Sequence, residues 1–322
     1  MTETKLSVII PHYNSPEKLE ILIKSIPDLD EIQVIVIDDN SNEKVDLLSL
    51  LQNKYKQRII FLQNNTNRNS AGTCRNIGLN RAKGDWVLFA DADDYFIDGW
   101  YEKISKLFIT HNDIVYFPPI SINLDTGETD VRHDAYKSLV FDYMTIPDRK
   151  NELRLRYRFF VPWSKLIRLD FIKQNNICFE DTLMGNDRLF SIKCGYYARN
   201  ITGCAAVIYC VTRQEGSLTT ISNRESFDIR HKVLIRCGAF LFQRLNATDI
   251  ELLGMETYGI RILYETLISG YGINLVKEYY FLIKNAGIPV FKWSLFYPSR
   301  LYKAMIRVMK KKKQQITEKG RK

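Results

Sequence analysis

The sequence contains few of the residues that build zinc sites or disulfide frameworks. Its 322 residues include four histidines, none closely spaced, and six scattered cysteines without a C-x-x-C pair. Structural zinc sites usually show closely spaced cysteine and histidine ligands, so this pattern argues against one. The cysteine usage is typical of a cytoplasmic chain with reduced, buried thiols.

The sequence also lacks long hydrophobic runs. No stretch reaches the roughly 18 uncharged apolar residues that indicate a transmembrane helix. The amino terminus, Met1–Lys5, continues directly into a strand pattern and does not resemble a signal peptide. We therefore expect a cytoplasmic protein.

A basic excess is missing from most of the chain. The net charge is +9, but ten basic residues and one acidic residue lie from Arg300 onward, which leaves 36 of each sign in residues 1–299. The body of the protein therefore has no charge bias that would favour a nucleic-acid partner.

The basic residues of the tail alternate with apolar and aromatic ones. Residues 291–313 combine an apolar stripe with clustered lysines and arginines, a pattern that suits the surface of an anionic membrane. We expect peripheral attachment to the inner face of the plasma membrane. A solvated basic tail is the alternative.

Strand and helix patterns alternate over residues 5–117. Apolar runs of strand length are followed by segments of helical periodicity, which predicts a mostly parallel sheet with helices on both faces. The predicted strands are 5–10, 33–37, 58–62, 86–90 and 113–117. Residues 120–160 carry no assignable pattern, a strand is predicted over 204–212, and 226–286 reads as helical.

Polar residues follow three of these strands. Asp91 and Asp93 come after the run 86–90, Asp38 and Asp39 follow the second strand, and Asn14 follows the first. Ligands of an open parallel sheet bind beyond the carboxyl ends of its strands. Two adjacent carboxylates repel each other, and a divalent cation relieves that repulsion. A solvated acidic turn is the alternative.

Four motifs in these positions match a family. They are SVIIPHYN (7–14), VIDDNS (36–41), AGTCRNIGL (71–79) and GDWVLFADADD (84–94). In this order and spacing they strongly resemble family 2 glycosyltransferases, nucleotide-sugar enzymes of the Rossmann-like GT-A fold. The resemblance is dense over residues 5–117 and thinner to about residue 220.

The resemblance implies roles for the nucleotide-binding residues. Pro11, Tyr13 and Asn14 would frame the base, Asp39 would reach the base N3–H or the ribose, and Arg75 would lie near the base or the diphosphate. Asn14 could instead cap a helix, and Arg75 could lie on a helix surface.

The acidic turn matches the D-x-D motif of the family. The resemblance places Asp91 toward the ribose and Asp93 on a Mn²⁺ or Mg²⁺ ion at the diphosphate, with Asp91 beside the metal. Arg213, in a segment 213–217 similar to a family segment, would approach the same diphosphate.

The second half of the domain would bind the acceptor. Trp163 and Lys165 belong to a W-x-K-L stretch that the resemblance places at a wall of the acceptor cleft. In the segment 185–190 relatives often carry Glu-Asp; here Asn186 replaces the glutamate, and Asp187 remains as the expected general base.

Other interpretations of this acidic segment stay open. Asp187 could be a plain helix cap. Glu180 and Asp181 are rival bases.

The predicted organisation has two parts. Residues 1–220 form a GT-A domain, with a nucleotide-sugar half (1–117) and an acceptor half (118–220), and residues 221–322 form a helical region that ends in the basic amphipathic tail.

The resemblance implies transfer of one sugar, with inversion, from a nucleotide sugar, by family habit a UDP-sugar. The acceptor would be a glycan or a lipid-linked sugar in capsule, exopolysaccharide or O-antigen synthesis. The Q-x-x-R-W motif of processive synthases is missing. The alternatives are an inactive, membrane-docked nucleotide-sugar-binding protein and a sugar nucleotidyltransferase.

Overall fold

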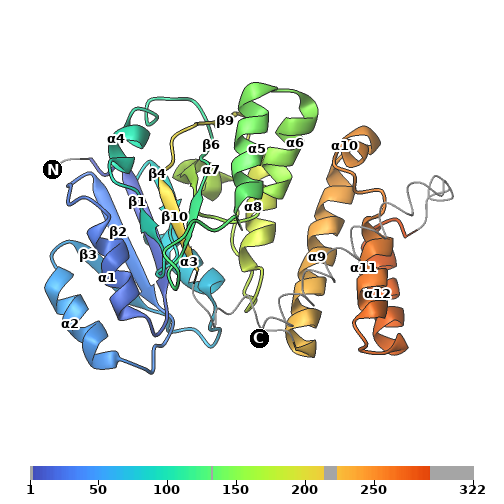
Figure 1. The fold of residues 1–322 in the computed structure, drawn as a ribbon, viewed down its shortest axis with the longest axis horizontal. Coiled ribbons are helices and arrows are strands. Elements are labelled where there is room, and N and C mark those ends of the chain that lie inside the picture. The colour runs from blue at the N-terminus through green and yellow to red at the C-terminus, as the bar shows by residue number, and fades with distance from the viewer. Residues whose placement is uncertain (1–2, 132, 214–222, 291–322) are drawn as a thin grey trace. The chain divides into compact units, whose positions relative to one another are not determined.

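A computed structural model describes residues 3–131, 133–213 and 223–290. The chain divides into two compact units, Met1–Ser222 and Asn223–Lys322 (Figure 1). The tail 291–313, for which we expect membrane attachment, lies outside the described residues.

The first unit contains a seven-stranded sheet of order β3-β2-β1-β4-β8-β6-β9. Strand β8 runs antiparallel to both of its neighbours, and the other pairs are parallel. The predicted mostly parallel sheet is therefore confirmed. The strands are β1 Leu6–His12, β2 Ile32–Asp38, β3 Ile59–Gln63, β4 Trp86–Phe89, β6 Ile114–Tyr116, β8 Lys165–Arg168 and β9 Ile201–Gly203.

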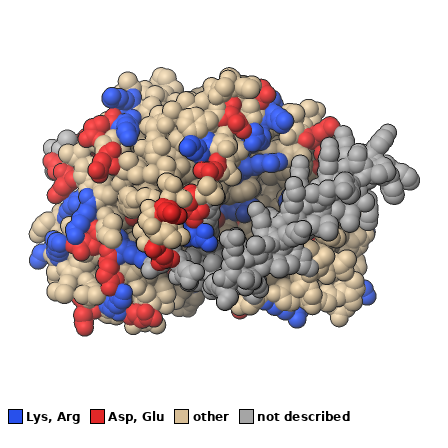
Figure 2. All heavy atoms as spheres, viewed as in Figure 1, with Lys and Arg blue, Asp and Glu red and all other residues tan. Residues whose placement is uncertain are grey.

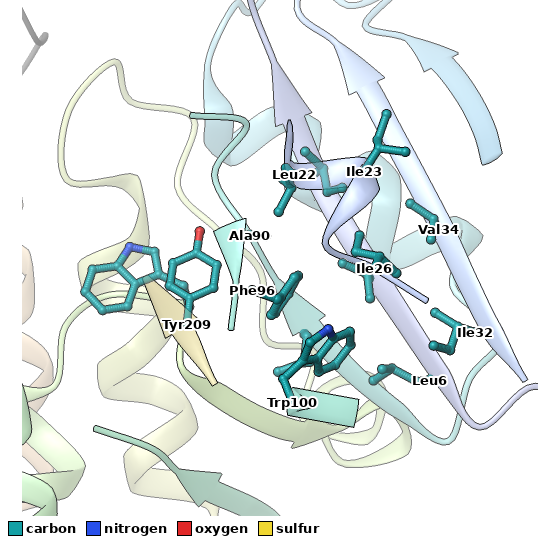
Figure 3. Packing of buried hydrophobic residues seen from close by; sticks show 14 of the residues in the cluster. Leu6, Leu22, Ile23, Ile26, Ile32, Val34, Ala90, Phe96, Trp100 and Tyr209 are labelled. Carbon is teal, nitrogen blue, oxygen red and sulfur yellow. The ribbon is translucent and has the colours of Figure 1, made fainter. Parts of the chain in front are cut away.

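Helices cover both faces of this sheet because successive side chains of a strand point in opposite directions. Val8 and Ile10 of β1 belong to one buried cluster with α1, α2 and α4, and Ile9 belongs to a second cluster with α3, α7 and α8. Figure 3 shows residues of the first cluster, among them Leu22 and Ile23 of α1 and Val34 of β2. The helices are α1 Pro16–Lys24, α2 Val45–Tyr55, α3 Ala71–Arg81, α4 Trp100–Ser105, α5 Asp134–Thr145, α6 Arg149–Arg158, α7 Leu169–Gln174 and α8 Asn186–Tyr197.

A second sheet of three strands lies in the same unit. Its order is β5-β10-β7, with β5 Tyr95–Phe96, β10 Tyr209–Arg213 and β7 Ile120–Asn123. The sequence predicts a strand over 204–212, but the strand begins only at Tyr209. Strand β10 runs antiparallel to β5, which directly follows the acidic turn 91–94. The second sheet therefore brings the end of the first unit to that turn.

The unassigned segment 120–160 contains β7, α5 and α6. Helix α6 shows no clear apolar stripe because Arg156 is buried within it, where its guanidinium binds Glu152 and the carbonyl oxygens of Gly195 and Ala198. The helix packs closely on α8, since a Cβ at Gly195 would lie 2.3 Å from the Arg156 carbonyl oxygen. The charged Arg156 occupies a core position of α6, so the apolar spacing typical of a helix is not visible in the sequence.

The second unit is helical, as predicted. Its helices are α9 Arg224–Arg244, α10 Ala247–Leu252, α11 Tyr258–Ile268 and α12 Ile273–Asn285. The side chain of Asn223 caps α9 by accepting a hydrogen bond from the Ser226 N–H, and Ile262, Tyr279 and Ile283 are fully buried in its core. Among the helices described, none is long and apolar enough to cross a membrane.

Charges of both signs are interspersed on one face of the first unit (Figure 2). On the face shown in Figure 2, lysine and arginine side chains of the first unit lie among aspartate and glutamate side chains. This mixture agrees with the balanced charge of residues 1–299.

Candidate functional site

Three strand ends meet at one edge of the main sheet. Strands β2, β1 and β4 are neighbours and run parallel. The carboxyl ends of these strands therefore lie side by side, together with the segments at those ends: 38–41 for β2, 11–14 for β1 and 90–94 for β4. The sequence predicts this arrangement from the polar residues after each strand. In parallel sheets this edge is where ligands bind.

A buried histidine braces the first two of these segments. The Ser15 N–H donates to His12 Nε2 at 3.2 Å, so the proton lies on Nδ1, which donates to Asp38 Oδ1 at 2.9 Å. Asp38 also accepts from the backbone N–H and the hydroxyl of Ser41. Burial raises the pKa of Asp38, but these hydrogen bonds outweigh it and leave the pKa below its usual value. Asp38 therefore holds the loop, and the sequence does not reveal the role of His12.

Asp39 is oriented by the neighbouring strand end. Its backbone N–H donates to the His12 carbonyl oxygen at 2.8 Å, and its Oδ1 accepts from Asn64 Nδ2 at 2.6 Å. Asn64 is fully buried and also accepts from Thr66. A side chain held in this way is fixed before a ligand arrives.

Asn14 joins the loops that follow β1 and β2. Its Oδ1 accepts from the backbone N–H groups of Asn42 and Glu43 at 2.9 and 3.1 Å, and its Nδ2 donates to Asn42 Oδ1 at 2.8 Å. The N-cap of α1 is Ser15, not Asn14. Pro11 is buried in β1, whereas the Tyr13 side chain is 51% exposed. The ring of Tyr13 therefore offers a stacking surface beside the fixed Asn14 loop.

The acidic turn presents two carboxylates of different exposure. Asp91 is one-third exposed, and its Oδ1 accepts from Arg75 Nη2 at 2.5 Å. Asp93 is exposed. Partial desolvation and the neighbouring Asp91 carboxylate raise the pKa of Asp93. The described residues contain no cluster of three or more cysteine, histidine or carboxylate side chains that could hold a metal alone.

This donor set fits a metal that a diphosphate also binds. Mg²⁺-type ions usually keep several waters and take one or two carboxylates together with substrate phosphates. Asp91 and Asp93 supply such a pair. Desolvation and, after it, repulsion by Asp91 raise the pKa of Asp93, and a bound cation relieves that repulsion.

Arg75 links the acidic turn to helix α8. It lies on α3 and is 5% exposed, so the alternative of a surface residue is wrong. Its Nη1 donates to Asn186 Oδ1 at 2.9 Å while Nη2 binds Asp91, and its Cζ lies 5.4 Å from the centroid of the Phe179 ring. The amide of Asn186, at the position where relatives often carry glutamate, thus accepts a hydrogen bond without adding a charge.

Asp187 lies in the first turn of α8 beside this pair. The helix has Gly185 as its N-cap, at φ 69°, so Asp187 is inside the helix and not its cap. The side chain is half-buried. Burial raises the pKa of Asp187, and the positive charges of Arg75 and Arg188 partly offset the rise. A carboxylate with a raised pKa, close to the sheet edge where ligands bind, is suited to accept a proton.

The rival Asp181 is held by Arg68, which precedes helix α3, and by Thr73 within that helix. Its Oδ2 accepts from Arg68 Nη1 at 2.5 Å and its Oδ1 accepts from Thr73 Oγ1 at 3.0 Å. Glu180 is half-buried, and a Cβ at Gly72 would lie 2.3 Å from its carbonyl oxygen. The segment before α8 therefore packs directly on α3, which favours Asp187 over Asp181 as the base.

Trp163 and Lys165 are buried, 4% and 1% exposed. Lys165 Nζ donates to the Phe159 carbonyl oxygen at 2.7 Å, and burial lowers its pKa to about 7. The Trp163 ring stacks on the Tyr209 ring, with 5.7 Å between centroids. Both side chains therefore lie beneath the surface, and a position at a wall of the acceptor cleft stays a prediction.

Arg213 is the last residue of β10, and its side chain is 48% exposed. Its Nη1 lies 3.1 Å from Asp130 Oδ2. Residues 214–217 of the predicted segment lie outside the described residues, so an approach of Arg213 to a diphosphate stays a prediction.

The family can be stated from a comparison with known proteins. The family model described as Glycosyl transferase family 2 matches residues 7–174, more than half of the chain. The chain belongs to glycosyl transferase family 2.

Curated family 2 relatives share about a quarter of the residues. The poly(ribitol-phosphate) β-N-acetylglucosaminyltransferase TarS of Staphylococcus aureus (strain MW2) is 28% identical over 243 residues, which cover 72% of this chain and 40% of TarS. The cholesterol galactosyltransferase of Borreliella burgdorferi is 27% identical over 248 residues, 71% of this chain and 64% of that protein. The match thus spans less than two-thirds of either relative.

Solved structures show the same fold. Residues 1–349 of S. aureus TarS in complex with UDP-GlcNAc match with a TM-score of 0.61 and 24% identity, covering 83% of this chain and 73% of that chain. The mannosyltransferase PcManGT of Pyrobaculum calidifontis, in complex with GDP-Man and Mn²⁺, matches with a TM-score of 0.58 and 13% identity over 96% of this chain and 85% of that one. The GT-A fold expected from the motifs is confirmed.

Proposed function

We propose that this family 2 chain is an inverting glycosyltransferase that moves one hexose-type sugar from a UDP-sugar to a hydroxyl group of an acceptor. The observation that carries the proposal is the Asp91–Arg75–Asn186 bridge, which joins the strand-end edge to the helix turn that holds Asp187. It brings nucleotide-binding groups and a base candidate to one site. The UDP-GlcNAc bound to the TarS structure supports the choice of nucleotide.

In this mechanism the chain's own residues bind, orient and accept a proton. Tyr13 stacks on the base, and Asp39, fixed by Asn64, accepts a hydrogen bond from the base or the ribose. Asp187 takes the proton of the acceptor hydroxyl as that oxygen attacks the anomeric carbon. A single displacement inverts the configuration, so a UDP-α-sugar gives a β-linked product.

Asp93, together with Asp91, would hold Mn²⁺ or Mg²⁺ in this site. When bound, such an ion neutralises charge on the leaving diphosphate. The Mn²⁺ in the PcManGT complex supports this choice of metal. Arg213 would add a positive charge on the same side.

The acceptor we propose is a glycan or lipid-linked sugar of a bacterial surface polysaccharide. The names of several relatives support this class, among them the poly(ribitol-phosphate) glycosyltransferases of S. aureus and Bacillus spizizenii. A sugar nucleotidyltransferase is not favoured, because the family 2 model covers the nucleotide-binding half.

Transfer activity is the test of this function. A panel of UDP- and GDP-sugars with Mn²⁺ is screened by thermal shift, since a ligand that binds only the folded state raises the melting temperature. The stabilising donor is then incubated with short glycan acceptors, and the anomeric configuration of the product is read by NMR. A retained configuration contradicts the single displacement. Donor binding without transfer to any acceptor supports the inactive binding protein instead.

Membrane attachment through residues 291–313 is a separate part of the proposal and rests on the sequence alone. Each basic residue near an anionic surface contributes about 1 kcal/mol, which fades with salt. Removal of residues 299–322 should release the protein from vesicles that contain phosphatidylserine and leave transfer to a short acceptor unchanged. If the truncated chain binds the same vesicles with unchanged affinity, this part of the proposal is wrong.

A further inference from the structure

A buried tyrosine hydroxyl contacts the acidic turn at two points. Tyr209 on β10 is fully buried. Its oxygen accepts a hydrogen bond from the Asp91 backbone N–H at 2.8 Å, and its proton is donated to Asp94 Oδ2 at 2.9 Å. The single hydroxyl thus serves both the start and the end of the turn.

A second residue of β10 holds the rest of the turn. The Thr212 N–H donates to Asp94 Oδ1 at 2.7 Å, and the Thr212 hydroxyl donates to the Asp93 carbonyl oxygen at 2.5 Å. The turn is closed by the Asp94 N–H, which donates to the Asp91 carbonyl oxygen at 3.0 Å. Two residues of one strand therefore bind all three aspartates of the turn.

Asp94 is the buried anchor of these contacts. It is 3% exposed, and both of its oxygens accept hydrogen bonds from β10. A buried carboxyl group that loses a donor costs more free energy than an exposed one, because water cannot replace the donor. The conformation of the turn is therefore tied to β10.

Aromatic packing fixes the position of the Tyr209 ring. It stacks on Trp163, with an interplanar angle of 18°, and meets Phe96 edge-on at 5.3 Å between centroids; Figure 3 shows Phe96 and Tyr209 within the buried cluster. Trp163 of the W-x-K-L stretch is thus packed directly on the tyrosine that contacts the turn.

We infer that Tyr209 is a positioning residue, which with Asp94 and Thr212 sets the turn conformation in which Asp91 and Asp93 meet a metal-bound nucleotide diphosphate. The inference rests on the proposed function. Arg75 fixes the Asp91 side chain from α3, while Tyr209 fixes its backbone from β10. Loss of the hydroxyl leaves the Asp91 N–H without an acceptor and Asp94 short of a donor, so the turn shifts and the carboxylates move.

Tyr209→Phe tests the inference, with Tyr116→Phe as its matched control. Tyr116 is also fully buried, but its hydroxyl has no hydrogen-bond partner among the described residues. The dissociation constant of UDP is measured by calorimetry with saturating Mn²⁺, and the Mn²⁺ midpoint is measured with saturating UDP, both well below the melting temperature. We expect both to rise about 10-fold in Tyr209→Phe, on the scale of one or two lost hydrogen bonds. In Tyr116→Phe they should change less than about 2-fold on the same scale.

Thr212→Val is a second variant that removes only the hydroxyl contact to the Asp93 carbonyl oxygen. It should raise the Mn²⁺ midpoint by a smaller factor than Tyr209→Phe does. If Tyr209→Phe does not fold, Thr212→Val alone tests whether the contacts from β10 position the turn. A fall in melting temperature with unchanged UDP and Mn²⁺ binding would show that the contacts are only structural and would overturn the inference while the proposed function stands. A wild-type protein that binds no nucleotide or nucleotide sugar overturns the proposed function and the inference together.

Discussion

The acidic turn 91–94 and the segment 179–187 carry three carboxylates each, but they use them differently. In the turn the buried Asp94 is the anchor, and Asp91 and Asp93 stay at least partly exposed. In the segment, Asp181 is bound by Arg68 and Thr73, whereas Asp187 lies in the first turn of α8, where burial raises its pKa. In both regions the carboxylate that supports the structure, Asp94 or Asp181, is a different one from the carboxylate that we place in the chemistry, Asp93 or Asp187.

The two regions are joined by helix α3. Arg75 binds Asp91 and Asn186, Thr73 binds Asp181, and the Asn76 side chain pairs with the backbone N–H and carbonyl of Phe179. One rigid helix therefore sets the distance between the donor-binding turn and the base, as a transfer reaction requires.

The largest effect is expected from Asp187→Asn. The amide keeps the shape of the side chain but cannot accept the acceptor proton, and general base catalysis contributes about 10²- to 10⁴-fold. We expect kcat to fall by that factor while donor affinity stays the same. Steady-state kinetics with a saturating donor measures kcat. If Asp187→Asn retains half of the wild-type turnover, another residue is the base.

A smaller loss of activity is expected from Asp93→Asn, which removes the exposed carboxylate of the acidic turn. Removing one carboxylate from a metal-binding pair should weaken Mn²⁺-dependent donor binding by about 10- to 100-fold, the loss usual even for groups that only support a ligand. EDTA should abolish transfer in the wild type, and added Mn²⁺ or Mg²⁺ should restore it. Full activity in EDTA would contradict the assignment of the pair.

Asp181→Asn should leave the chemistry almost unchanged. Its side chain supports the segment, and since Arg68 is largely exposed, loss of its ion pair should cost only about 1 kcal/mol of the free energy of unfolding. Denaturation in urea and kcat are measured on the same preparation. A fall in kcat as large as that of Asp187→Asn would show that the occupied carboxylate acts in the reaction.

The smallest effect on activity is expected from Lys165→Met. This variant tests the charge state of a lysine that is buried beside the site. The folded state releases the Lys165 proton near pH 7, whereas the unfolded chain keeps it up to its ordinary pKa of 10.5. Between these values the unfolded state binds more protons, so this residue makes the free energy of unfolding rise with pH. The difference in unfolding free energy, wild type minus variant, should therefore grow from about pH 7 to about pH 9, by at most about 1.4 kcal/mol per pH unit. A flat difference would show that Lys165 keeps its proton in the core.

Much of the donor half could be predicted from the sequence because its signals are local. Each strand is a continuous apolar run, and each is followed within a few residues by the polar group that it positions, as with Asp39 after β2 and Asp91 after β4. Neighbouring parallel strands then bring these groups together without further information.

The rest depends on partners far away in the sequence. Tyr209 and Asp94 are 115 residues apart, and nothing in the apolar pattern of β10 marks the tyrosine as a hydrogen-bond partner. Lys165 looks like a surface residue until the Phe159 carbonyl and the rings of Tyr116 and Phe159 enclose it. Arg156 likewise hides the period of α6, because its charge is satisfied by Glu152 and by carbonyl groups of α8 and its carboxyl end.

A crystal structure of the protein with UDP and Mn²⁺ would show where the donor and the metal bind. We expect the uracil ring beside Tyr13 and Asp39, and the diphosphate and metal at Asp91 and Asp93. The side chain of Asp187 should face the space next to the β-phosphate. A nucleotide bound away from the ends of β1, β2 and β4, or a metal coordinated without Asp93, would contradict these expectations.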